Sequence, residues 1–124
     1  MGSVQSMMGS GLPAAASKAV HVGTVNEAVS AAGTTTADAT ALVADSNVVT
    51  TAAASTGVRL PDAEVGTSII IVNGQASNAL KVYPHSGGKV NNLSADAGGT
   101  IGASKSGIAV RLSSTHWALV GDLA

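Results

Sequence analysis

More than half of this chain consists of residues with little or no side chain to bury, which limits the hydrophobic core that it can build. Alanine, glycine, serine and threonine make up 64 of the 124 residues, phenylalanine and cysteine are absent, and tyrosine and tryptophan occur once each. Apolar burial stabilises a fold by roughly 25 cal/mol per Å², so alanine and valine contribute little per residue. Without cysteine, no disulfide compensates for a thin core. The composition therefore indicates a subunit that gains stability from a partner surface.

The chain carries little charge. Charged residues make up 10% of the sequence, the formal net charge is −1, and the basic residues are scattered. Nucleic-acid-binding domains usually gather basic residues on one face. The longest strongly apolar run, residues 69–72, is far shorter than the 18 or more residues of a membrane span, and the N-terminus lacks the features of a signal peptide. We therefore expect a soluble, non-secreted protein with no nucleic-acid partner and no membrane association.

Two regions differ in pattern. Residues 1–20 mix glycine, serine and alanine without a sustained hydrophobic period, which predicts an extended arm. Met7, Met8 and Leu12 are the candidate anchors through which this arm would contact a neighbouring subunit. Residues 21–124 are expected to form a single β domain.

Several short segments have the composition of strands. Clusters of β-branched residues predict strands at 40–43 and 47–52, whereas the alanine content of 26–32 permits a turn or two of helix. Further strands are predicted at 57–61, 67–73, 80–83, 90–93, 108–112 and 117–120. Their spacing, with glycine and asparagine turns between them, indicates an all-β fold, namely a small antiparallel β-sandwich or barrel.

Two antiparallel hairpins are predicted among these strands. One joins 67–73 to 80–83 through a connection that begins at Asn73-Gly74, a strong turn signal. The other joins 108–112 to 117–120 across Ser113, Ser114 and Thr115.

No metal or cofactor site is predicted. His21, His85 and His116 are far apart in the sequence and have none of the close spacings of zinc ligands. The acidic residues form no calcium-binding loop. We therefore expect neither a metal nor another cofactor.

A serine acyl-enzyme pattern is present only in fragments. Ser86 and Lys89 have the spacing of a Ser-x-x-Lys pair, which requires a helix to bring both side chains to one face. Pro84 and Gly87 disfavour that helix. With no catalytic constellation left, the sequence predicts a protein that is not an enzyme.

The aromatic residues are the candidate interface residues of the β domain. The indole of Trp117 could anchor an interface, stack on a sugar or fill the core, and Tyr83 is the second candidate. A carbohydrate-binding module would combine Tyr83, His85 and Trp117 in one stacking patch. A small hydrolase would instead use Ser86 and His85, and would lose its activity in a Ser86→Ala variant.

About half of the chain resembles small virion proteins of tailed bacteriophages. The resemblance lies in the order of short motifs rather than in a diagnostic signature. These motifs are Gly57-Val-Arg-Leu-Pro61, Gly66-Thr-Ser-Ile-Ile-Ile-Val-Asn73, Leu80-Lys-Val-Tyr-Pro84, Ser86-Gly-Gly-Lys-Val-Asn91 and Ser114-Thr-His-Trp117. The first third of the chain departs from the pattern.

The resemblance implies a capsid decoration (cement) protein on the outer surface of the virion, made in the host cytoplasm. Its partners would be the major capsid protein or other virion proteins, and by analogy with that class it would be a homotrimer. The alternative is a tail, fibre or other attachment component with a carbohydrate- or protein-binding surface.

Overall fold

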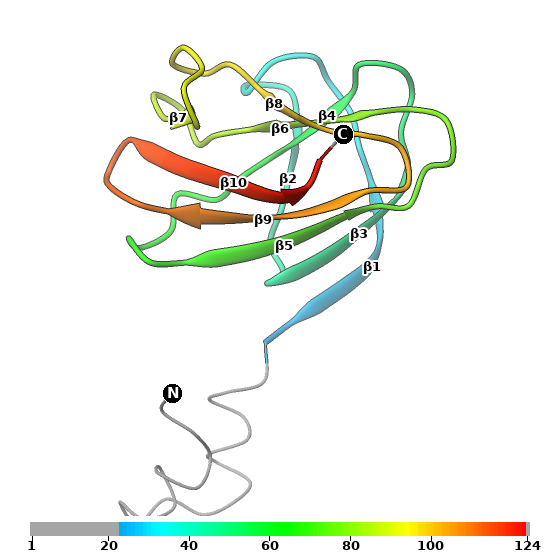
Figure 1. Cartoon of the computed structure of the whole chain (residues 1–124), viewed down its shortest axis with the longest axis horizontal. Helices are drawn as coiled ribbons and strands as arrows, with labels where there is room; N and C mark the ends of the chain where they lie inside the picture. The colour runs from blue at the N-terminus through cyan, green and yellow to red at the C-terminus, as the bar shows by residue number, and fades with distance from the viewer. Residues whose placement is uncertain (1–22, 124) are drawn as a thin grey trace, which may run out of the picture.

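The computed structural model describes residues 23–123, which form ten strands and no helix (Figure 1). The predicted all-β class is confirmed. The arm at residues 1–20, with Met7, Met8 and Leu12, lies outside the described residues. The strands are β1 (Val25–Ser30), β2 (Thr40–Ala41), β3 (Ser46–Thr51), β4 (Gly57–Arg59), β5 (Ser68–Asn73), β6 (Leu80–Tyr83), β7 (Lys89–Val90), β8 (Gly99–Ile101), β9 (Ser106–Arg111) and β10 (His116–Asp122).

The first six strands alternate between two sheets. β1, β3 and β5 pair in parallel in one sheet, and β2, β4 and β6 pair in parallel in the other. The chain therefore winds as a solenoid does, and each turn adds one strand to each sheet. Val25, Ser46 and Ile70 occupy equivalent positions in successive turns. The arrangement is β-solenoid-like and is not a clear sandwich or barrel.

The last four strands complete both sheets. β9 pairs antiparallel with β5 and with β10, while β8 pairs antiparallel with β6 and β7 pairs parallel with β10. The result is a six-stranded sheet of order β1-β3-β5-β9-β10-β7 and a four-stranded sheet of order β2-β4-β6-β8. Among the described residues, five of the eight strand pairings are parallel, which departs from the antiparallel arrangement predicted.

One of the two predicted hairpins is wrong and the other is confirmed. β5 has β3 and β9 on its two edges, so no edge remains for β6, which pairs with β4 and β8 in the other sheet. The segment after Asn73 is a corner between the sheets: the Gln75 amide donates to Asn73 Oδ1 at 3.1 Å, and Asn73 Nδ2 donates to the Asn78 carbonyl at 2.9 Å. The hairpin of β9 and β10 forms as predicted.

Two other segments differ from the expectation. Residues 25–30, where a turn or two of helix was permitted, form β1, because pairing with β3 overrides the helix propensity of alanine. β8 was not predicted at all, because Gly98 and Gly99 indicate a loop. A Cβ atom at Gly99 would lie 3.0 Å from the Leu119 side chain and 3.1 Å from that of Val90, so a larger residue here would require those side chains to shift.

The two sheets enclose one hydrophobic core. Alternation along β5 buries Ile69 and Ile71 and leaves Ser68 and Ile70 exposed, as expected for a sheet with one buried face. The largest fully buried apolar side chains are Trp117, Leu60, Ile71, Leu80 and Ile101. Trp117 is therefore the largest side chain of a core that has few other large side chains.

A buried asparagine ties the end of β5 to the second half of the chain. Asn73 is fully buried, and its Nδ2 lies 2.9 Å from the Asn78 carbonyl, 3.2 Å from that of Ile101 and 3.1 Å from that of Gly102. Asn73 therefore satisfies backbone carbonyls at the corner and at the end of β8, of which the hydrogen bond to Ile101 is buried and the other two are partly buried.

We predict that Asn73→Ala destabilises the fold by about 1–3 kcal/mol, because it removes the amide that donates to the buried Ile101 carbonyl and to two partly buried carbonyls. Urea unfolding of the full chain measures the effect. Asn92→Ala, a matched change at an exposed position, should alter the free energy of unfolding by less than about 0.5 kcal/mol. Equal stabilities of the two variants would contradict the role of Asn73.

Candidate functional site

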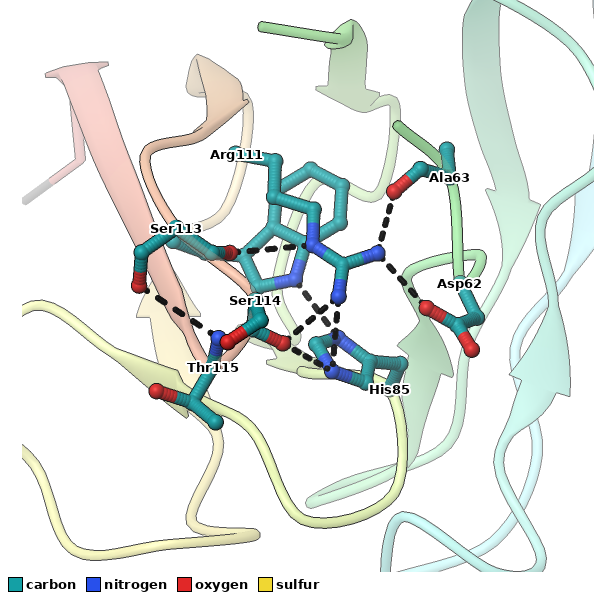
Figure 2. A network of polar contacts seen from close by, with 8 residues as sticks. Asp62, Ala63, His85, Arg111, Ser113, Ser114 and Thr115 are labelled. Carbon is teal, nitrogen blue, oxygen red and sulfur yellow. Dashed lines mark hydrogen bonds and ion pairs between the residues drawn. The ribbon is translucent and has the colours of Figure 1, made fainter. Parts of the chain in front are cut away.

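A polar network surrounds the guanidinium of Arg111 at the end of β9 (Figure 2). Nε donates to the Ser113 carbonyl at 3.1 Å, and Nη2 donates to the Ser114 carbonyl at 2.6 Å. Nη1 donates to the Asp62 carboxylate at 2.6 Å and to the Ala63 carbonyl. Arg111 therefore fastens the turn between β9 and β10 to the loop that precedes β5.

The core and this network meet at His85. The indole Nε1 of Trp117 donates to His85 Nδ1 at 3.0 Å, which makes Nδ1 an acceptor and places the ring proton on Nε2. Nε2 then donates to the Ser114 carbonyl, also at 3.0 Å. Arg111 Nη2 lies 3.3 Å from the same Nε2, but both atoms carry protons, so this contact is not a hydrogen bond. His85 is held as the neutral tautomer by groups on both sides.

This arrangement does not suit catalysis by Ser86 and His85. A general base needs a ring nitrogen within reach of the proton that it accepts. Both ring nitrogens of His85 are engaged within the fold, and the ring is only 9% exposed. The network acts as a clamp between loops.

Asp62 is the exposed end of the clamp. Its side chain is 77% exposed, whereas that of Arg111 is 8% exposed. The hydrogen bond from Arg111 and, next, the positive charge of Arg111 hold the pKa of the Asp62 carboxyl below its ordinary value, against a smaller opposing effect of desolvation.

The aromatic residues expected at an interface lie inside the fold. Trp117 is 0% exposed and Tyr83 is 7% exposed, and the Tyr83 hydroxyl donates to the Thr34 carbonyl at 2.8 Å. The prediction that these two rings anchor an interface is therefore corrected, because neither presents its face to a partner. The same burial removes the sugar-stacking patch of Tyr83, His85 and Trp117. For Trp117, filling the core was the right alternative.

The exposed face of the six-stranded sheet carries a different candidate site. Strand register places one residue from each of five adjacent strands in a line across this face, which we call the apolar row: Val25, Ser46, Ile70, Ile108 and Val120. Its four apolar members are 64%, 42%, 40% and 52% exposed, in chain order. Large side chains of this kind normally point inward in a chain so poor in them.

The middle of the apolar row has uncharged surroundings, whereas Glu27 and Asp122 lie beside its two ends, on β1 and β10. Val48 and Val72 lie next to it in one direction along the strands, and Val110 and Ala118 lie next to it in the other, all partly exposed. An ion pair between Lys105 and Asp122, at 3.5 Å, lies at the margin, where β10 ends. Contiguous exposed apolar surface of this kind marks a site of contact with another molecule.

Sequence reasoning missed this site because its members are distributed over residues 25–120. Ile70 and Ile108 each alternate with buried neighbours, so each looks like an ordinary strand residue. Only the register of β5 with β9 shows that the two are direct neighbours.

Other kinds of site are not seen in the described part of the chain. Residues 23–123 contain no group of three or more potential metal-ligating side chains and no helix long and apolar enough to cross a membrane. Two open depressions lie on the surface, one near Arg59 and Asp62 and the other near Lys81 and Leu93. The Arg59 guanidinium is already bonded to the carbonyls of the loop beside it.

No protein-family model, no curated protein and no solved structure matches this chain. Its function is therefore argued from its own residues and geometry.

We predict that Arg111→Met destabilises the fold by about 2–4 kcal/mol, because the buried guanidinium is lost together with its partly buried hydrogen bonds to three carbonyls and to Asp62. Arg59→Met is the matched control, since Arg59 is half-buried and donates through one nitrogen to the Thr36 and Ala37 carbonyls. Urea unfolding should show the smaller loss for Arg59→Met. Equal losses in the two variants would contradict a special role for Arg111.

The lowered pKa of Asp62 predicts a pH-dependent contribution to stability. A carboxyl whose folded-state pKa is below the unfolded value of 3.8 stabilises the fold above that pH, and the contribution is lost as the pH falls through the folded-state pKa. Asp62→Asn should therefore melt below the wild type at pH 7 and approach it in strong acid. Glu64→Gln, in the same exposed loop, controls for the loss of one negative charge. A difference between wild type and Asp62→Asn that does not change with pH would contradict this assignment.

Proposed function

We propose that this chain is a structural subunit of a phage virion, of the head-decoration type, that binds to neighbouring virion proteins and stabilises the capsid. The observation that carries the proposal is the apolar row on the exposed face of the six-stranded sheet. A face of this kind serves protein–protein contact, because burying it removes apolar area from water without leaving a charge unpaired.

The polar features of the fold agree with a structural role. His85 and Arg111 are the histidine and the arginine with the most polar contacts, and these contacts hold loops in place. Together with the low charge of the chain, this supports a role in assembly rather than in chemistry. The motifs between Gly57 and Trp117 resemble those of tailed-phage virion proteins, and this resemblance is the reason for proposing that the assembly is a virion.

The proposed mechanism is mechanical. A subunit that binds the mature capsid, and not its separated proteins, shifts the equilibrium toward the intact capsid by mass action. Seated on the outer surface across the joints between capsid subunits, it adds contacts that expansion or internal pressure must break. A homotrimer is the stoichiometry that the resemblance implies for such positions.

The attachment alternative is less well supported. A carbohydrate-binding tail or fibre component needs an exposed aromatic platform, and Tyr83 and Trp117 are buried. The exposed residues of the apolar row are aliphatic, and aliphatic side chains do not stack on sugar rings.

Mixing the full chain with capsids tests the proposal. The genome that encodes the chain identifies the phage, and capsids are prepared from particles lacking this protein. We expect the chain to co-sediment with the capsids in a fixed number of copies and to raise the temperature at which they release DNA. Absence of binding to capsids, together with its absence from purified virions by mass spectrometry, would overturn the virion role.

A further inference from the structure

We propose that the apolar row is covered by another copy of this chain, so that the assembling unit is a homo-oligomer held together by its six-stranded sheets. This inference rests on the proposed role as an assembly subunit. It adds which surface joins the copies and which side chains carry the contact.

The shape of the surface suits the packing of one sheet on another. The apolar row crosses five neighbouring strands, which at a strand spacing of about 4.8 Å span about 19 Å. Two sheets pack with their faces about 10 Å apart when their side chains interdigitate, and isoleucine and valine fill that space. Ile70 and Ile108 lie near the middle of the row and would form the centre of the contact.

The area is that of a small contact. Strands of about six residues at about 3.3 Å per residue give the face a length of about 20 Å, and the five strands of the apolar row give a width of about 19 Å. Each copy therefore offers about 380 Å², or about 760 Å² for a pair, which is the size of a weak contact whose occupancy depends on the protein concentration.

The charge distribution favours a copy of the same chain over a charged partner. The residues of the apolar row and those beside its middle, Val48, Val72, Val110 and Ala118, carry no charge, so the central parts of two such faces meet without repulsion between like charges. Charged residues stand at the two ends of the row, where Glu27 and Asp122 follow Val25 and Val120 by two residues on the same strands. A strongly charged partner would lose hydration on this face and find no counter-charge there. Lys105 and Asp122, at the margin, already neutralise each other.

The composition of the chain gives a further reason. Ala, Gly, Ser and Thr make up 64 of the 124 residues, yet four of its large aliphatic side chains lie outside the core in a single row. Covering them with another copy would add apolar burial to a fold whose own core is small.

The test is the mass of the full chain in solution, measured by sedimentation over a range of concentrations. We expect the wild type to form a dimer or trimer, and Ile70→Lys and Ile108→Lys each to weaken that association at least tenfold. Val43→Lys is the matched control, because Val43 is 86% exposed in the loop between β2 and β3, away from this face. Circular dichroism and thermal melting establish that each lysine variant is folded.

Crosslinking provides a second readout. The chain contains no cysteine, so Ile70→Cys, Ile108→Cys and Val43→Cys each introduce a unique thiol. A short bis-maleimide reagent should link copies of the first two variants and not of the third. A monomeric wild type at all concentrations, or an oligomer unaffected by both lysine changes, would overturn the inference.

Capsid binding separates this inference from the proposed function. An oligomer lost in Ile70→Lys, in a protein that never binds capsids, would support the inference about the row and refute the virion role. Capsid binding by a wild type that is monomeric in solution would uphold the virion role and refute the self-contact. An Ile108→Lys variant that sediments as the wild-type oligomer but no longer binds capsids would assign the row to the capsid protein and overturn the self-contact.

Discussion

The hydrogen bond from Trp117 to His85 connects the hydrophobic core to the polar network around Arg111. On one side of it the fully buried indole packs in a core built mainly from small and medium aliphatic side chains. On the other side His85 meets the carbonyl that Arg111 also binds. Packing and polar contacts are thus joined through one pair of rings, tilted by 58° with centroids 6.4 Å apart.

Local patterns identified most strands, but they did not identify strand partners. The β-branched residues of β3 and the alternation of β9 and β10 were readable because each depends on neighbours in sequence. The partner of β5 was not readable, because Asn73-Gly74 indicates a hairpin in isolation. β5 pairs with β6 only if one of its two edges is free, and β3 and β9 occupy both. The partner of β5 is therefore a property of the whole sheet.

The same distinction explains the outcome for the candidate site. Aromatic residues are frequent at interfaces, which favours Tyr83 and Trp117 as interface candidates, yet in a chain with few large side chains both are buried in the fold. Conversely, Ile70 and Ile108 were expected only as strand residues. Their exposure follows from the pleat: with Ile69, Ile71 and Ala109 turned inward, their neighbours must turn outward.

The winding of the first six strands makes the length of the apolar row depend on the number of turns. Each turn contributes one outward-facing residue to the apolar row, from Val25 to Ser46 to Ile70, without altering the direction of the strands before it. Duplication of one turn within the gene would lengthen the row by one strand spacing, about 4.8 Å. A family built on this plan could therefore adjust the extent of its contact surface by the number of turns, while the Trp117–His85 pair, which lies outside these turns, stays unchanged.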